Sequence, residues 1–261
     1  LGFIEANKDR PFFCYAAWTL PHGDFEVPGI APEFAGKPWP ENVKAHATML
    51  QRLDRDVGTL LEKLSALGIE RNTLVIYTSD NGPAGPGGKI FDGSAGLRGA
   101  KRDLHEGGIR APLLARWPGR IQAGSTSDLL TSHVDWMATA CELGGVKPPR
   151  TDGISIVPTL LGKPQTAKHE HLYWEIYEGP MPFQQAVRVG DWKGYRTALR
   201  GSLQLHNLAR DPTEQTDVAA QHRDIVTKIE AIMAAEHVTS PHWEPVETPQ
   251  AAKKKSRSKE Q

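Results

Sequence analysis

The chain has 261 residues, with 31 basic and 31 acidic side chains, so its formal net charge at neutral pH is zero. This balance gives no reason to expect a nucleic-acid partner, and no apolar run approaches the roughly twenty residues that a membrane-spanning helix needs. The length suits one large domain or a large and a small one, and the 39% hydrophobic content is typical of a globular protein.

The first part of the sequence alternates between strand and helix patterns. Residues 11–18 are apolar and aromatic, which favours a buried strand, and a long loop rich in proline and glycine follows. Leucines recur at helical spacing across residues 42–67, and Gly68 stands where a C-terminal cap belongs. The apolar run 74–77 predicts a second strand. A strand, a helix and a strand in succession imply that the two strands pair in parallel.

Beyond this unit, residues 82–100 are predicted to form a glycine-rich loop, followed by a strand at 113–117. A helix over 135–143 is expected to end at Gly144-Gly145. From about residue 165 short aromatic segments separated by glycines and charged turns predict an antiparallel sheet, with strands near 172–174, 186–189, 192–195 and 203–208. A short amphipathic helix at 225–235 would cover one face of that sheet.

We therefore predict an α/β fold. Residues 1–164 would form part of a mixed, mainly parallel sheet flanked by helices, and residues 165–244 a small domain with an antiparallel sheet and a helix. The tail 245–261 is basic and rich in lysine, and we predict that it is disordered. A solvated tail is favoured over a role in binding nucleic acid or heparin.

The residues Asp80 and Asn81 follow the predicted strand 74–77 directly. Open α/β sheets place their ligand sites at the carboxyl ends of strands, and carboxylate and amide oxygens suit a hard cation such as calcium. Taken by itself, Asp-Asn-Gly favours a tight turn over a metal site.

A cation, Lys101, lies about twenty residues further on, in a loop bordered by Gly96, Gly99, Gly107 and Gly108. Glycines let the backbone approach an anion closely. A divalent metal and a lysine that converge on one place would hold a sulfuryl or phosphoryl group. The alternative for Lys101 is an ordinary exposed loop lysine.

Together these motifs resemble the sulfatase family of the alkaline-phosphatase superfamily. The resemblance extends over nearly the whole chain in the expected order, and its segments are Pro11–Tyr15 with Pro21-His22, Ser79–Gly82, Gly96–Lys101, Glu106–Gly108, Trp117–Ile121, Asp152–Ser155, Gly190–Lys193 and Leu208–Glu214.

The resemblance implies a sulfuric ester hydrolase that depends on calcium and on formylglycine. It further implies that Asp80 and Asn81 are metal ligands, that Lys101 contacts the sulfate and the bridging oxygen, and that His22 lies near the leaving group. Without the resemblance, His22 would be taken for a loop histidine. The resemblance also implies a periplasmic or secreted protein whose ligand is a sulfate-ester small molecule or a sulfated carbohydrate.

The family's nucleophile is missing from these residues. Formylglycine is made from a cysteine within Cys-x-Pro/Ala-x-Arg, whereas neither Cys14 nor Cys141 is followed by the required arginine, and a buried, inert thiol is expected for each. Calcium takes six to eight oxygen ligands, of which Asp80 and Asn81 supply two or three. We therefore expect the chain to be the C-terminal part of a longer sulfatase, without its nucleophile and inactive alone.

Two other functions stay open at this point. A phosphodiesterase or phosphonate hydrolase of the same superfamily would use a similar metal and lysine, and a non-catalytic module would bind a sulfated glycan without cleaving it.

The remaining candidate site residues have weaker sequence signals. Trp174, Tyr177 and Phe183 could stack on a sugar or belong to the core, Arg98 and Arg102 could meet an anionic substrate, and His169-x-His171 is a weak metal motif.

Overall fold

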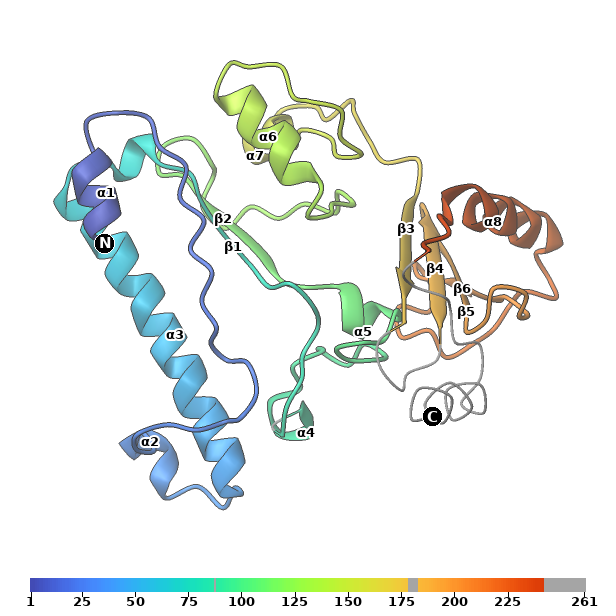
Figure 1. Cartoon of the computed structure of the whole chain (residues 1–261), viewed down its shortest axis with the longest axis horizontal. Helices are drawn as coiled ribbons and strands as arrows, with labels where there is room; N and C mark the ends of the chain where they lie inside the picture. Colours follow the sequence, from blue (N-terminus) through green and yellow to red (C-terminus); the bar gives the residue numbers. More distant parts are fainter. Residues whose placement is uncertain (87, 178–182, 242–261) are drawn as a thin grey trace.

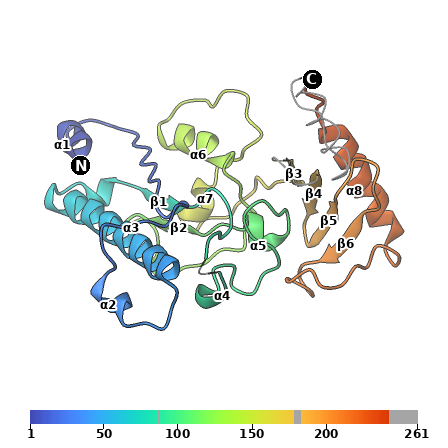
Figure 2. The same cartoon turned by 60° about the horizontal axis from the view of Figure 1, so that its bottom comes forward.

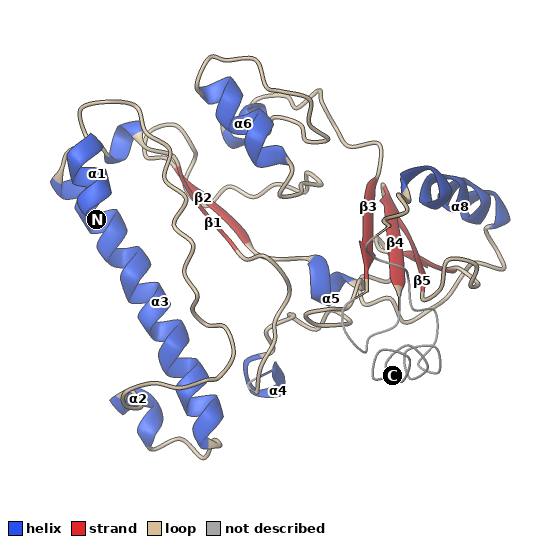
Figure 3. Ribbon diagram, viewed as in Figure 1, coloured by secondary structure: helices blue, strands red, loops and turns tan. Residues whose placement is uncertain are grey.

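The structure, a computed structural model, describes residues 1–86, 88–177 and 183–241. The basic tail 245–261 lies outside the described residues. Helices and strands are mixed along the chain, as expected for an α/β protein, and the strands form two separate sheets (Figure 3). None of the helices in the described residues is both long and apolar enough to cross a membrane.

The longest helix, α3, spans Glu41–Ala66 and agrees closely with the prediction. Leu53 and Leu64 on its apolar side are buried whereas Leu50 is exposed, and its C-terminal end is closed by Gly68 with a backbone φ of +70°, a conformation that glycine adopts without strain. Gly68 N donates to Ser65 O and Ile69 N donates to Leu64 O, which is the hydrogen-bond pattern of a Schellman cap. The other helices before the second sheet are short: α1 (Gly2–Asn7), α2 (Pro32–Ala35), η1 (Glu70–Asn72), α4 (Gly88–Phe91), α5 (Glu106–Ile109), α6 (Asp135–Leu143) and α7 (Val157–Leu160).

The first sheet corrects the sequence prediction. Within the described residues it consists of β1 (Val75–Thr78) and β2 (Leu113–Arg116), which pair antiparallel, with Val75 opposite Arg116. The predicted strand at 11–18 is not formed, so the predicted parallel pairing is absent from the described residues. Phe13 and Tyr15 in this segment are 75% and 84% exposed. The physical reason is that a strand needs a hydrogen-bonded neighbour, and no described strand lies beside this segment.

The second sheet is an antiparallel meander, as predicted. Its strands β3 (Leu172–Ile176), β4 (Gln184–Val189), β5 (Trp192–Arg196) and β6 (Gln204–Asn207) lie in chain order. Helix α8 (Arg223–Glu236) covers one face, where its side chains Val226, Ile229 and Met233 meet Val187, Leu203 and Leu205 in the main hydrophobic core.

The two sheets are connected through the region around α5. In both views α3 lies on one side, β1 and β2 cross the middle, and α5 stands between that pair and the four-stranded sheet, with α8 on the opposite side (Figure 1, Figure 2). A smaller core cluster accounts for this contact, because Leu104, just before α5, packs against Ala186 of β4 and Tyr195 of β5.

Candidate active site

The segment Asp80-Asn81-Gly82 leaves β1 without forming the tight turn that Asn-Gly favours in isolation. The backbone N–H of Gly82 donates to the carbonyl oxygen of Gly108 at 2.7 Å. The side chain of Asp80 is exposed and that of Asn81 is half-buried, and the hydroxyl of Ser79 donates to the backbone oxygen of Asn81 at 3.2 Å. No cation among the described residues forms an ion pair with Asp80.

A second hydrogen bond brings Lys101 to the same place, since its backbone N–H donates to the carbonyl oxygen of Pro83 at 2.9 Å. The two segments touch so closely that side chains are excluded between them. A Cβ atom added to Gly82 would lie 1.9 Å from Gly107 O and 2.8 Å from Gly108 Cα. The structure therefore places the backbone that carries Asp80 and Asn81 directly against the loop that carries Lys101.

His22 is exposed, and among the described residues no side-chain contact joins it to Asp80, Asn81 or Lys101. Its loop nevertheless reaches the same region through Phe25. That ring occupies the space beside Gly85, where an added Cβ would lie 2.5 Å from Phe25 Cζ, and it packs against the His46 ring of α3 with centroids 4.7 Å apart. The loop that carries His22 is thus anchored to the segment that follows Asp80 and Asn81.

The donors fit part of a calcium site. Asp80 and Asn81 offer carboxylate and amide oxygens, the ligand types that calcium prefers, and the side chain of Asp80, whose Oδ1 accepts from Ser79 Oγ at 3.5 Å, is exposed. In the described ranges no group of three His, Cys, Asp or Glu side chains is arranged to hold a metal ion. The six to eight ligands of calcium would therefore have to come from more than these residues.

The cysteines differ from the prediction in one respect. Cys141 is partly buried on α6, but Cys14 is exposed, contrary to the expected buried thiol, because the segment 11–18 has no partner strand to cover it.

The loop after Lys101 is held by buried polar side chains that the sequence analysis did not single out as a group. Glu106 is 2% exposed, and its carboxylate lies 2.9 Å from Lys193 Nζ and 3.2 Å from Arg188 Nη1. Lys193 Nζ lies 3.2 Å from Glu214 Oε1. The sequence signal was present, because three of these residues belong to the separate motifs Glu106–Gly108, Gly190–Lys193 and Leu208–Glu214, but nothing in the sequence shows that the motifs meet.

Two neighbours define the electrostatics of this loop. The His105 Nδ1 atom lies 2.6 Å from Asp103 Oδ1, and the His105 ring packs against that of Tyr195 at a tilt of 40°, with centroids 4.2 Å apart. Burial alone would raise the pKa of Asp103, but hydrogen bonds from His105 outweigh it, and the pKa is lowered. Burial also raises the pKa of Tyr195 to about 12. His105 is thus buried between its partners Asp103 and Tyr195.

The weaker candidates have other partners. His169 pairs with buried Asp135 at 2.8 Å and His171 with Glu236 at 3.0 Å, so the two imidazoles do not share a metal. Phe183 is fully buried, which assigns it to the core, and Trp174 packs against the cluster of Leu104. Arg98 donates from Nη1 to the carbonyl oxygen of Glu214 at 2.7 Å.

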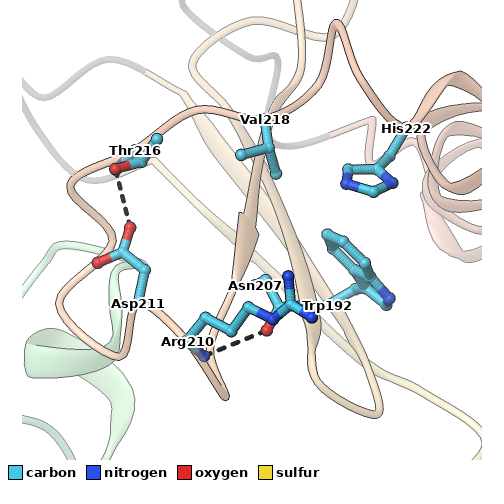
Figure 4. Close-up of a pocket in the computed structure, with 7 residues that line it drawn as sticks. All are labelled: Trp192, Asn207, Arg210, Asp211, Thr216, Val218 and His222. Atoms are coloured by element: carbon cyan, nitrogen blue, oxygen red, sulfur yellow. Dashed lines mark hydrogen bonds between the residues drawn. The ribbon is translucent and has the colours of Figure 1, made fainter.

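A cavity of about 370 Å³ lies in the second sheet rather than at Asp80 and Lys101 (Figure 4). Several of its polar groups are already engaged, since the Asp211 carboxylate accepts from Thr216 N at 2.8 Å and Asn207 Oδ1 accepts from Arg210 N at 3.2 Å. It is lined by Trp192, Asn207, Arg210, Asp211, Thr216, Val218 and His222. We do not assign it to the candidate active site.

Comparison with known families and proteins is consistent with this geometry. The family profile described as Sulfatase matches residues 1–146, and that described as N-sulphoglucosamine sulphohydrolase, C-terminal, matches residues 98–238. The steryl-sulfatase of Rattus norvegicus is 37% identical over 74% of this chain and 34% of its own length. The N-acetylgalactosamine-6-O-sulfatase of Bacteroides thetaiotaomicron is 28% identical over 89% of this chain and 48% of its own length.

Among solved structures, Ps i-CgsB in complex with k-i-k-neocarrahexaose superposes with a TM-score of 0.79 at 26% identity, covering 98% of this chain and 57% of that protein. The chain spans about a third to a half of the length of these two curated relatives.

Proposed function

Because the chain belongs to the sulfatase family, we propose that it forms part of an enzyme that hydrolyses sulfuric esters. The observation that carries the proposal is the contact between the segment of Asp80 and Asn81 and the loop of Lys101, made by two backbone hydrogen bonds, from Gly82 to Gly108 and from Lys101 to Pro83. This contact sets the backbone of Asp80 and Asn81 beside the backbone of Lys101, which supports a shared site in which oxygen ligands and a cation would recognise a sulfate group.

In this proposal each residue has a distinct task. Asp80 and Asn81 hold calcium through their side-chain oxygens, and calcium when bound supplies positive charge that polarises the sulfate oxygens. The ammonium group of Lys101 binds the sulfate and stabilises the negative charge that develops on the bridging oxygen. His22 would donate a proton or a hydrogen bond to the departing alkoxide, which leaves as the alcohol.

The nucleophile is proposed to lie outside the 261 residues. Neither Cys14 nor Cys141 stands in the sequence context that formylglycine formation requires, and the oxygen donors present fill only part of a calcium site. The chain by itself would bind but not turn over a sulfate ester. We further propose that residues 1–164 contribute the catalytic groups, that residues 165–244 form the small supporting domain, and that the protein is periplasmic or secreted.

A sulfated carbohydrate is the proposed substrate class. The support comes from a relative that acts on an N-acetylgalactosamine 6-O-sulfate and from a structural neighbour solved with a neocarrahexaose. The groups placed around Lys101 recognise the sulfate and not the sugar, so the proposal extends to the class of ligand only.

The test uses the full-length protein that contains these residues. Release of sulfate from a sulfated monosaccharide is measured beside release of phosphate from the matching phosphate ester, for the parent protein and for the variants Lys101→Met and Lys147→Met. Lys147 is exposed and serves as the matched lysine control. We expect sulfate release, a fall in kcat/KM of about 10²- to 10³-fold in Lys101→Met, and no change in the control. Faster release of phosphate, or an unaffected Lys101→Met variant, would overturn the proposal.

A further inference from the structure

A single glutamine of the second sheet clamps the backbone next to Lys101. Gln184 is 3% exposed at the start of β4, and its Nε2 atom donates to Arg102 O at 2.9 Å while its Oε1 atom accepts from Leu104 N at 3.2 Å. The hydroxyl of Tyr195 donates to the same Oε1 atom at 3.2 Å. One side chain thus satisfies the carbonyl group of Arg102 and the amide group of Leu104, the residues on either side of Asp103. These two hydrogen bonds hold this stretch of the loop in one conformation.

The hydrogen bonds with Gln184 hold the backbone in a conformation that is unfavourable for a residue with a side chain. Arg102, the residue directly after Lys101, has a φ of +75°, a region that residues with a side chain rarely adopt. Such a conformation persists only where the surroundings enforce it. The hydrogen bond from Gln184 to Arg102 O is one of the contacts that do so.

A buried set of charges fixes the other end of the loop. Lys193 on β5 and Glu214 are both fully buried, and Lys193 Nζ lies between the carboxylates of Glu106 and Glu214. Glu214 Oε2 also accepts the backbone N–H of Glu106 at 2.6 Å. Arg188 supplies the second positive charge, so two carboxylates face two cations. Because a buried charge is strongly unfavourable without its partner, Glu106 has only one position in which it can be buried.

The loop that carries Lys101 runs between these two anchors. From Glu106 the connection continues through α5, where Gly107 N donates to Arg98 O and Gly108 O accepts from Gly82 N, each at 2.7 Å. The backbone of Lys101 is therefore fixed to the Asp80 segment on one side and to the second sheet on the other.

We propose that Gln184 and Lys193 are positioning residues for Lys101, so that the small antiparallel sheet sets where the sulfate-binding lysine stands. The assignment of a sulfate-binding role to Lys101 rests on the proposed function. The mechanical connection, by which Gln184 and Lys193 hold the backbone on both sides of Lys101, rests on the contacts alone. Neither Gln184 nor Lys193 touches the substrate in this proposal. They act through the backbone on both sides of Lys101.

Hydrogen exchange of individual backbone amides tests the connection directly in the chain. The reporters are the amides of Gly82, Lys101 and Gly107, and the reference amides are Ile69 and Val146, which close α3 and α6 far from the loop. We expect exchange at the three reporters to accelerate at least tenfold in Gln184→Met and in Lys193→Met, with the reference amides unchanged. The matched control is Lys228→Met, an exposed lysine on α8. Unchanged reporters in both variants would overturn the inference.

A double variant separates positioning from general stability. In Lys193→Met, Glu106 keeps Arg188 but the buried carboxylate of Glu214 loses its cation, and adding Glu214→Gln removes that unpaired charge, so the melting temperature of the double variant should recover toward the parent value. If the sheet positions Lys101, hydrogen exchange at the three reporter amides stays fast in the double variant although its melting temperature recovers. If exchange returns to the parent rate together with the melt, Lys193 contributes only to stability and the inference fails.

Turnover in the full-length protein distinguishes this inference from the proposed function. We expect Gln184→Met to lower kcat/KM for a sulfated monosaccharide about tenfold, with Lys228→Met unaffected. Fast reporter exchange with unchanged turnover would mean that the position of Lys101 is irrelevant to the reaction, which overturns its role in the proposed function. A parent protein without sulfatase activity would overturn the proposed function while the exchange data still decide the mechanical connection.

Discussion

The backbone N–H of Gly82 donates to the carbonyl oxygen of Gly108 at 2.7 Å, and no side chain fits between the two segments. This contact sets Asp80 and Asn81, which precede Gly82, against the loop of Lys101, which precedes Gly108. The close approach requires that Gly82 has no Cβ atom, because an added Cβ would lie 1.9 Å from Gly107 O.

The first prediction concerns Gly82→Ala. The added Cβ would lie 1.9 Å from Gly107 O and 2.8 Å from Gly108 Cα, so the two segments must separate, and we expect a loss of about 1–3 kcal/mol in the free energy of unfolding. The measurement is urea denaturation. Gly58→Ala is the matched control, because nothing lies within 4 Å of its Cβ position in the middle of α3, and a gain of about 0.5–1 kcal/mol is expected there. Equal effects at the two sites would contradict the prediction.

The second prediction concerns calcium. Replacing Asp80 by alanine removes the only charged ligand that this segment offers, and we expect calcium affinity of the full-length protein to fall about tenfold or more. Isothermal titration with calcium measures the effect. Asp54→Ala, at an exposed position on α3, should bind calcium like the parent protein. An Asp80→Ala variant with the parent affinity would show that the metal ligands lie elsewhere.

The third prediction concerns the dependence of stability on pH through His206. Burial lowers the pKa of this residue, and although the Thr216 carbonyl and Glu214 act in the opposite direction, the pKa stays below its usual value. The folded state therefore binds this proton less readily than the unfolded state. The contribution of His206 to the free energy of unfolding is fully present above the pKa of about 6.5 that this residue has in the unfolded state. It is lost as the pH falls below that value toward the lower pKa of the folded state.

Thermal melts between pH 7.5 and pH 5 test this prediction in the parent chain and in His206→Asn. The asparagine amide can replace the His206 Nδ1 atom, which lies 2.9 Å from Thr216 O, but it does not titrate. We expect the variant to be less stable at neutral pH but to lose less stability on acidification. A parallel loss in both proteins would exclude His206 as the group responsible.

The fourth prediction concerns solubility. Phe13 and Tyr15 are 75% and 84% exposed in a segment without a partner strand, and exposed apolar groups of this kind favour association. We expect the double variant Phe13→Ser/Tyr15→Ser to scatter less light at high concentration while its melting temperature stays within a few degrees. Val238→Ser, which changes an equally exposed but isolated residue, should leave scattering unchanged.

Several elements were predictable because their signals are local. The periodic leucines of α3 with Gly68, the Gly144-Gly145 end of α6 and the aromatic segments of the second sheet all appear where the sequence places them. Helix periodicity, caps and short alternating strands depend on residues that are near one another in the chain. The strand predicted at 11–18 failed because pairing depends on a distant neighbour, which apolar composition does not reveal.

The sequence by itself determined the family of this protein and the candidate residues His22, Asp80, Asn81 and Lys101, because these lie in motifs whose order and residue types are specific. Only the tertiary structure decided what holds Lys101. Glu106, Lys193 and Glu214 come from three distant motifs, yet they share one buried set of charges, and Gln184 fixes the backbone beside them. A charge enters the interior only with its partner, and the sequence does not state which charges become partners.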